Sequence, residues 1–369
     1  MFVAAHNGAR IWGGAELALA RLLAGLQGRG HRVLLYCNRP VVAEGAARMG
    51  VPSRIAHIGG DVAIFDAVRF GLHLRNAPPD VLIVGTYKKL FHAVLAARIG
   101  HIPRVVARVG LESDVPRAWK YRYALRHGVD LVVVTAERMR GPFVDLLGED
   151  SGRVTVIPNA APSPPELPSR AAARAELGLP PAAPLIGVVA RLASQKRLDR
   201  FLRALSRLSP EVHGVIAGDG PERAALEQLS RDLGLGGRVH FLGHREHPWP
   251  VYAALDLMVI SSDREGMSNA MLEAIAAGVP VLSTPVSGAA DALHAEPDGR
   301  RPGVVLETFS EEELATVLHE VISSPTRLAE MREAACARAR SEFNFDLLLD
   351  RWEAALTGGM NPSGSMLTR

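Results

Sequence analysis

The sequence predicts an α/β protein of two doubly wound parallel sheets, each forming its own domain. Short apolar runs alternate with amphipathic stretches along all 369 residues. Runs that are apolar on both faces are typical of strands in a parallel sheet that helices cover on each side. The length exceeds that of one ordinary core, and a proline-dense stretch interrupts the alternation near the middle. Each half is therefore expected to be a separate α/β unit.

The apolar runs indicate where the strands lie. In the first half they are Phe2–Ala5, Val33–Cys37, Val81–Val84, Val105–Val109, Leu131–Val134 and Val154–Ile157. In the second half they are Leu185–Ala190, Val212–Ala217, Val239–Leu242, Leu257–Ile260 and Val279–Ser283. Ligands of open parallel sheets bind at the carboxyl ends of the strands. With two such sheets facing each other, the cleft between them is the expected site.

The connection between the halves covers residues 158–184, which contain APSPPELPS and LPPAAP and show no apolar periodicity. Such composition is typical of a linker. We therefore place the boundary near residue 165, with one domain over 1–165 and a second domain over 166–345.

The end of the chain is expected to be helical. Ser310 and Glu313 predict a capping box for a helix that runs to about Ser323. A last helix carries an apolar stripe that ends in Trp352. Within 346–369 we expect this helix to pack back toward the first domain and the tail GGMNPSGSMLTR to be disordered.

Composition excludes several classes of protein. Hydrophobic residues make up 48% and charged residues 22%, values of a soluble globular enzyme. No run of about 18 apolar residues is present, so no membrane-spanning helix is expected. The start MFVAAHNGAR lacks a basic region followed by an apolar one, so no signal peptide is expected. Cys37 and Cys336 lie far apart, which favours reduced thiols and a cytoplasmic location.

Charge is distributed unevenly along the chain. Residues 1–165 hold 21 Lys and Arg against 12 Asp and Glu, and the remainder holds 21 against 27. A basic first half favours an anionic partner there, either an acidic acceptor or a membrane surface; drift in composition is the alternative. The segment from Trp119 to Arg126 adds aromatic rings between cations, a pattern that suits lipid headgroups but also an ordinary exposed helix face.

The stretch that organises the chain is SSDREGMSNAMLEAIAAGVPVLSTP, from Ser261 to Pro285. It predicts a strand end, a loop, a helix and another strand. Glu265 falls in the loop, and Ser268 or Asn269 can cap the helix. A helix start attracts phosphate through its unpaired N–H groups and its dipole. Glu273, about one turn into the helix, can face the same cleft and suits a sugar ring; alternatively both glutamates are solvated charges.

Two cations follow the first strand of the second half. Arg191 and Lys196 lie in a loop between that strand and a helix. A guanidinium fork and an ammonium can together hold a diphosphate and neutralise a leaving group; solvated loop cations are the alternative.

Three weaker candidates lie in loops. Gly218, within AGDGPE, permits a close approach to a nucleotide or forms a plain tight turn. His244 could flank a base or be a surface histidine. Gly13 and Gly14, at a helix entrance in the first half, permit backbone N–H groups to approach a phosphate or acceptor, or form a structural loop. The 13 histidines form no ligand pattern with Cys or Asp, so no metal is expected.

Together these signals give the chain a recognisable order. It resembles the retaining glycosyltransferases of family 4 (group 1), which have the GT-B fold of two Rossmann-like domains. The matching motifs are GGAE at Gly13–Glu16, RGH at Arg29–His31, VIPNA at Val156–Ala160, VVARLASQK at Val188–Lys196, AGDGPE at Ala217–Glu222, FLG at Phe241–Gly243 and EGMSNAMLEAIAAGVPVLST at Glu265–Thr284. The resemblance covers nearly the whole chain, and the last motif is highly specific.

The resemblance implies roles for the donor-side residues. Arg191 and Lys196 would grip the donor diphosphate without a metal. Glu273 would bind the ribose hydroxyls, and Glu265 would face the donor sugar near the reacting carbon. The helix-start segment would hold sugar hydroxyls and phosphate through Gly266, Met267, Ser268 and Asn269.

It also implies roles for the remaining glycines and for His244. Gly13 and Gly14 would line the donor phosphate and the acceptor, and Gly218 would lie by the nucleotide. The loop near His244 would flank the base. Family members retain the anomeric configuration, which fits a front-face attack in which the leaving phosphate deprotonates the acceptor.

Two positions depart from the family pattern. Many members carry a glycine after the lysine, where this chain has Arg197, which would add a cation near the phosphates. Many also have a histidine after the strand that corresponds to Val105–Val109. Residues 110–114 read GLESD, so the contact of that histidine with the donor sugar is in question.

The sequence therefore predicts a cytoplasmic hexosyltransferase that needs no cofactor or metal and binds no nucleic acid. Peripheral contact with the inner face of the plasma membrane is the alternative to a location wholly in the cytoplasm. Its donor would be a UDP- or GDP-linked sugar, and its acceptor a glycan or lipid-linked saccharide of polysaccharide or lipopolysaccharide biosynthesis. The alternatives are a nucleotide-sugar epimerase of the same fold and a non-catalytic nucleotide- or carbohydrate-binding protein. A dehydrogenase is disfavoured because no GxGxxG follows the first strand.

Overall fold

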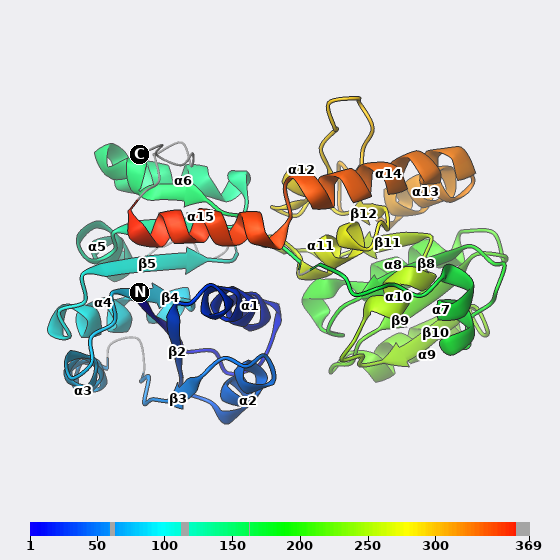
Figure 1. Ribbon diagram of the computed structural model, residues 1–369. Helices are drawn as coiled ribbons and strands as arrows, with labels where there is room; N and C mark the ends of the chain where they lie inside the picture. Colours follow the sequence, from blue (N-terminus) through cyan, green and yellow to red (C-terminus); the bar gives the residue numbers. More distant parts are fainter. Residues whose placement is uncertain (60–62, 112–117, 162, 359–369) are drawn as a thin grey trace. The chain divides into compact units, whose positions relative to one another are not determined.

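The computed structural model describes residues 1–59, 63–111, 118–161 and 163–358 (Figure 1). The chain divides into two compact units. Unit 1 is Met1–Asn159 together with the carboxyl-terminal stretch that starts at Asp346, and unit 2 is Ala160–Phe345. The division falls at Asn159 rather than near residue 165, because Ala161 already packs in the apolar core of unit 2.

Unit 1 is built on a sheet of seven parallel strands in the order β3-β2-β1-β4-β5-β6-β7. The strands are β1 (Phe2–Asn7), β2 (Arg32–Cys37), β3 (Ser53–Ile55), β4 (Val81–Val84), β5 (Arg104–Val109), β6 (Leu131–Val134) and β7 (Val154–Val156). The helices are α1 (Gly14–Gly28), α2 (Pro40–Arg48), α3 (Ile64–Arg75), α4 (Leu90–Ile99), α5 (Trp119–Gly128), α6 (Arg140–Leu147) and α15 (Phe345–Thr357).

Unit 2 is built on a sheet of six parallel strands in the order β10-β9-β8-β11-β12-β13. The strands are β8 (Leu185–Val189), β9 (His213–Ala217), β10 (Val239–Gly243), β11 (Leu257–Ile260), β12 (Val281–Ser283) and β13 (Gly303–Val305). The helices are α7 (Arg170–Glu176), α8 (Leu198–Ser206), α9 (Arg223–Asp232), α10 (Trp249–Ala254), α11 (Asn269–Ala276), α12 (Ala289–Leu293), α13 (Glu311–Ile322) and α14 (Pro325–Ser341).

Strands of unit 2 contribute side chains to apolar cores on both faces of the sheet. In β11, Met258 packs in one core with residues of α10 and α11, whereas Leu257 and Val259 pack in the other with residues of α8 and α13. Successive side chains of a strand point to opposite faces, so a strand covered on both sides is apolar throughout. This explains why the apolar runs of the sequence mark the strands.

All the predicted strands occur, with ends within two residues of those expected. The two missed strands, β3 and β13, each have three residues and lie at sheet edges. The connection predicted over residues 158–184 contains a helix, α7. The Ser169 hydroxyl caps α7 by accepting from the Ala172 N–H at 3.3 Å.

The start of α13 departs from the predicted capping box. Ser310 caps the helix, its hydroxyl accepting from the Glu313 N–H at 3.0 Å. The Glu313 carboxylate instead accepts from the N–H groups of Glu307 and Thr308, at 2.7 and 2.9 Å. Only the serine half of the box therefore forms, and the Glu313 carboxylate instead orders the loop that leads into the helix.

Helix α15 is tied to the rest of unit 1 by polar contacts. Arg29 donates to the carboxylates of Asp350 and Glu353, the latter at 2.8 Å. His31 contacts Glu353 at 2.7 Å, and Arg104 donates to the carbonyl of Ala355 at 2.8 Å. The last helix thus returns to the amino-terminal sheet, and the tail 359–369 lies outside the described residues.

Two fully buried histidines lie in the core of unit 1. His6, in β1, and His92, in α4, are 0% and 1% exposed, with His6 Nε2 3.2 Å from His92 Nδ1. Burial lowers the pKa of His6 to about 3, and repulsion from His92 and Lys89 adds to this. Burial lowers the pKa of His92 to about 4; Asp66 opposes this, whereas Lys89 and His57 support it. Both rings are therefore neutral at pH 7.

These histidines predict a loss of stability in mild acid. Because both folded-state pKa values lie below the unfolded value of about 6.5, the unfolded chain binds more protons between about pH 3 and 6.5. Stability is complete above pH 6.5 and falls below it, by at most about 1.4 kcal/mol per pH unit for each histidine. We expect the urea midpoint of unit 1 to fall less steeply from pH 7 to 4 in His92→Phe than in the wild type.

The control for this experiment is His319→Gln, which replaces an exposed histidine of α13. It should keep the wild-type slope. An equal slope in wild type and His92→Phe would mean that other groups, such as the carboxylates, account for the acid sensitivity.

Candidate active site

The candidate site of unit 2 lies where the order of the strands reverses. From β8 the chain runs outward through β9 to β10, then returns to place β11 on the other side of β8. The loops after β8 and β11 therefore diverge from neighbouring strand ends, and ligands of doubly wound sheets bind in such a crevice. These loops carry Arg191 and Lys196 on one side and Glu265 to Ser268 on the other.

The structure brings Lys196 and Glu265 together. The Lys196 ammonium is ion-paired with Glu265 Oε1, and the Ser262 hydroxyl donates to the same oxygen at 3.0 Å. Both side chains are mostly buried, with 19% and 13% exposed. Ser261, directly after β11, supports the arrangement, since its hydroxyl donates to the Lys196 carbonyl at 2.9 Å. An anion arriving here would meet a cation already held by a carboxylate.

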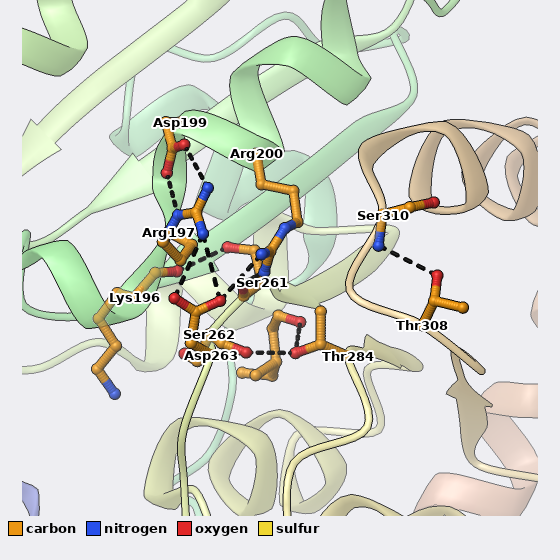
Figure 2. Close-up of polar contacts among 11 residues, drawn as sticks. Lys196, Arg197, Asp199, Arg200, Ser261, Ser262, Asp263, Thr284, Thr308 and Ser310 are labelled. Carbon is orange, nitrogen blue, oxygen red and sulfur yellow. Dashed lines mark hydrogen bonds and ion pairs between the residues drawn. The ribbon is translucent and has the colours of Figure 1, made fainter.

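Arg197, like Lys196, is already bound by carboxylates. Its guanidinium donates to the Asp199 carboxylate, at 3.0 Å from both Nε and Nη2, and to Asp263 at 3.3 Å. Figure 2 shows the Lys196 side chain extending away from this cluster. Hydrogen bonds with Asp199 raise the pKa of Arg197, and Asp263 adds to this. The expected extra positive charge near the phosphates is thus largely neutralised.

The backbone of Arg197 explains why a glycine is common here. Its φ is +49° and its ψ is +47°, the left-handed region that disfavours side chains with a Cβ. The buried Arg200 anchors the same turn, since it donates to the Ser261 carbonyl at 2.6 Å and to Asp263 Oδ1 at 2.9 Å (Figure 2). Asp263 therefore binds two arginines. These contacts hold the turn in a left-handed conformation that a glycine would adopt without strain.

Arg191 lies at the surface in the loop after β8. Among the described residues, its guanidinium has no hydrogen-bond or ion-pair partner. An exposed cation at the end of the central strand is available to an anionic ligand. His244, after β10, is likewise exposed.

Gly218 is required by its own backbone packing. Its φ is +143°, and a Cβ there would overlap the carbonyl oxygen of Ala190. Its N–H donates to the Gly243 carbonyl at 2.7 Å. Gly218 thus lets the turn after β9 lie directly against the loops that carry Arg191 and His244.

The residues before α11 form a tight, mostly buried turn. Met267 and Ser268 are each 5% exposed, and the Gly266 carbonyl accepts from the Gly288 N–H at 2.8 Å. Ser268 occupies the N-cap position, but its side chain makes no capping hydrogen bond, contrary to expectation. Asn269 is the first residue of the helix.

Glu273 lies on α11 and is 5% exposed. This burial excludes the alternative interpretation of Glu273 as a solvated charge. Its Oε2 accepts a hydrogen bond from the Tyr252 hydroxyl at 2.8 Å. Sequence reasoning did not find Tyr252, because the two residues lie on different helices and no spacing rule connects them.

The glycine loop of unit 1 also lies at a reversal of strand order, between β1 and β4. Gly13 precedes α1 and its N–H donates to Glu16 Oε2 at 3.2 Å; Gly14 begins the helix and is exposed. Thr86, after β4, accepts from the Gly8 N–H and donates to Asn7 Oδ1, both at 3.1 Å. The loops after the two strands are thus joined.

Arg108, in β5, is a buried cation that the sequence analysis also missed. It is 5% exposed and donates to Asn159 Oδ1 at 2.8 Å and to the Ala15 carbonyl at 3.5 Å. Burial lowers its pKa to about 10, with Glu16 opposing the shift. Arg108 thus links Asn159, where the first segment of unit 1 ends, to Ala15 in the first turn of α1. The histidine question after β5 falls partly on residues 112–114, outside the described residues.

The described residues lack two features. They contain no cluster of three or more His, Cys, Asp and Glu side chains that could hold a metal ion. None of their helices has the length and apolar character needed to cross a membrane.

Comparison with known proteins gives family matches for both halves of the chain. Residues 12–162 match the model described as Glycosyltransferase Family 4, and residues 169–340 match Glycosyl transferases group 1. The lipopolysaccharide core biosynthesis glycosyltransferase LpsE of Rhizobium meliloti is 36% identical over 160 residues, 42% of this chain and 46% of that protein. D-inositol 3-phosphate glycosyltransferase 2 of Catenulispora acidiphila is 31% identical over 299 residues, 76% of this chain and 64% of that protein.

The chain spans about half the length of several of these relatives, from 45% to 52%. Solved structures match it over nearly its whole length. Anabaena Alr3699/HepE, crystallised with UDP, has a TM-score of 0.84 at 19% identity, covering 97% of this chain and all of that one. WaaG, a glycosyltransferase of lipopolysaccharide biosynthesis, has a TM-score of 0.70 at 20% identity, with 97% and 100% covered. The chain belongs to glycosyltransferase family 4 and has the GT-B fold.

Proposed function

We propose that the protein is a retaining glycosyltransferase that needs no metal. It moves a sugar from a UDP- or GDP-linked donor to a glycan or a lipid-linked saccharide. The observation that carries the proposal is the Lys196–Glu265 pair at the strand reversal of unit 2, with Arg191 exposed in the same loop. The names of relatives that act in lipopolysaccharide biosynthesis support an acceptor of that class.

The charges suggest how transfer proceeds. The bond between the anomeric carbon and the diphosphate oxygen breaks, and the acceptor oxygen bonds to the same carbon on the same face. The acceptor proton passes to the departing phosphate oxygen, so no strong protein base is needed. Arg191 and Lys196 stabilise the negative charge that develops on the diphosphate. An ammonium has three N–H donors, so Lys196 can contact phosphate while Glu265 directs it.

Two alternatives use the same fold. A nucleotide-sugar epimerase would need acid and base residues on both sides of the sugar and no acceptor, so product analysis separates it from a transferase. A non-catalytic binding protein would have no need of the paired Lys196 and Glu265. The ion pair therefore favours transfer.

Thermal unfolding with UDP, GDP, ADP or no ligand, each with and without EDTA, tests the donor class. A ligand at about 100 times its Kd stabilises the folded state by about 2.7 kcal/mol, which shifts Tm by a few degrees. We expect UDP or GDP to shift the wild type, EDTA to have no effect, and Glu273→Ala to weaken the shift. The exposed Glu320→Ala on α13 is the control. If no nucleotide shifted the Tm, the hypothesis of a non-catalytic binding protein, or of a different ligand, would be favoured.

We also propose a cytoplasmic location with peripheral membrane contact through α5. Trp119 and Tyr123, one turn apart, are 76% and 51% exposed, and the helix also carries Lys120 and Arg122. An apolar pocket between α4 and α5 lies beside Tyr123. Aromatic rings and cations on one helix suit the headgroup region of an anionic membrane.

Cosedimentation with vesicles tests this contact. Binding to vesicles of phosphatidylcholine and phosphatidylglycerol is expected to exceed binding to phosphatidylcholine alone and to weaken with salt. Trp119→Ala should reduce it several-fold. Phe65→Ala, which removes an aromatic ring of α3 that is 92% exposed, is the matched control. Equal losses from both variants would place the contact elsewhere on unit 1.

A further inference from the structure

The contact between Tyr252 and Glu273 places a polar pair inside the core of unit 2. Tyr252, in α10, is 0% exposed, and its hydroxyl lies 2.8 Å from Glu273 Oε2. Apolar residues of the same core include Val251, Met271 and Ile275. A phenylalanine would supply the same apolar ring, so packing alone does not require the hydroxyl.

The hydroxyl has a specific effect on the carboxylate. The last torsion of a glutamate side chain is broad, so its rotamer preference does not set the orientation of the carboxylate. A tyrosine has few rotatable bonds, and burial of its ring fixes the position of its hydroxyl. The hydrogen bond therefore selects one orientation for the Glu273 carboxylate. It also satisfies part of the hydrogen-bonding demand of a buried carboxylate.

We propose that Tyr252 is a positioning residue for ribose recognition. It holds the Glu273 carboxylate in the orientation that accepts hydrogen bonds from the ribose hydroxyls, and so sets the preference of the site for ribonucleotides over 2′-deoxyribonucleotides. This rests on the proposed function, in which Glu273 binds the ribose. Tyr252 itself touches no substrate and acts only through Glu273.

The magnitude follows from the chemistry of the contact. A hydrogen bond to a charged group changes affinity by about 10- to 100-fold. The wild type should bind UDP more tightly than 2′-deoxy-UDP by about that factor. Loss of the Tyr252 hydroxyl removes one hydrogen bond that orients the carboxylate, so Tyr252→Phe should keep only part of that preference.

Calorimetric titration of the full chain with UDP and 2′-deoxy-UDP tests the proposal, with GDP and 2′-deoxy-GDP used in the same way. The variants are Tyr252→Phe, Glu273→Gln and the double variant. We expect Tyr252→Phe to reduce the ribose preference at least 3-fold and Glu273→Gln to abolish it. In the Glu273→Gln background, Tyr252→Phe should change nothing further. In turnover, Tyr252→Phe should raise KM for the donor and leave kcat nearly unchanged.

Tyr87→Phe is the matched control, since Tyr87 is a buried tyrosine of unit 1 at 7% exposed; it should keep the wild-type preference. The proposal is overturned if Tyr252→Phe keeps that preference while Glu273→Gln loses it, because Tyr252 would then be structural only. It is also overturned if Glu273→Gln keeps the preference. A wild type that binds none of the four nucleotides would instead remove the proposed donor class, and this inference with it. Glu273→Gln leaves Tyr252 intact, so the test survives if Tyr252→Phe fails to fold.

Discussion

Replacing Lys196 by alanine is expected to lower kcat by a factor of about 10² to 10³, the loss typical of removing one preorganised group that stabilises transition-state charge. Lys196 is mostly buried and already fixed by Glu265, so its charge needs little reorganisation when the diphosphate departs. The loss should appear in kcat more than in KM, because the charge on the leaving group grows during the reaction. Initial rates with the donor identified by thermal unfolding measure it.

The control is Arg197→Gly, at the next residue. Its guanidinium is bound by Asp199 and Asp263, and glycine suits its left-handed backbone. We expect activity within a few-fold of wild type. An equal loss in both variants would mean that the turn, rather than the Lys196 ammonium, is what the reaction needs. Thermal unfolding of Lys196→Ala without ligand checks whether the unpaired Glu265 has destabilised unit 2.

The sequence could predict the architecture because each strand of a parallel sheet that is covered on both faces appears as a continuous apolar run. Strands such as β4 and β11 are buried at every position, so an apolar run marks them. The prediction fails where the strand is too short or too exposed to give such a run. β13 has three residues at an edge, and β3 has two of its three residues exposed. α7 is hidden by the prolines around it, and its one buried cation, Arg174, pairs with the distant Asp256 at 2.9 Å.

The same distinction applies to the site. Lys196, Glu265 and Glu273 could be selected because they follow strands or begin a helix, and the ends of parallel strands share one edge of a sheet. Their partners could not be selected in this way. The hydrogen bond from Tyr252 to Glu273 and the ion pair between Asp263 and Arg197 are tertiary contacts between different elements. The sequence thus identifies the charged residues, and only the structure shows which of them are already paired.

Gly218→Ala is expected to have the largest effect on stability of any single methyl addition at the site. Alanine would have to adopt φ of +143°, and its Cβ would overlap the Ala190 carbonyl oxygen. Backbone strain of this kind costs about 1–3 kcal/mol, and displacement of a packed backbone adds to it. Because Ala190 directly precedes Arg191, displacement of this loop would also weaken the proposed contact between Arg191 and the donor diphosphate. We therefore expect unit 2 to unfold at least 5 °C lower and nucleotide binding to weaken.

Two other glycines of unit 2 distinguish backbone strain from steric contact as the cause of the lost stability. Gly236→Ala adds a methyl group in open space at an ordinary backbone angle and should be nearly neutral, whereas Gly237→Ala adds it in open space at φ of +79° and reports the strain alone. The ranking should be Gly218, then Gly237, then Gly236. If Gly218→Ala and Gly237→Ala were equally destabilised, strain would account for the whole effect, and contact with the β8 loop would not explain why Gly218 must be a glycine. If Gly218→Ala alone loses nucleotide binding, the glycine serves the site by letting the turn after β9 support the loop that carries Arg191.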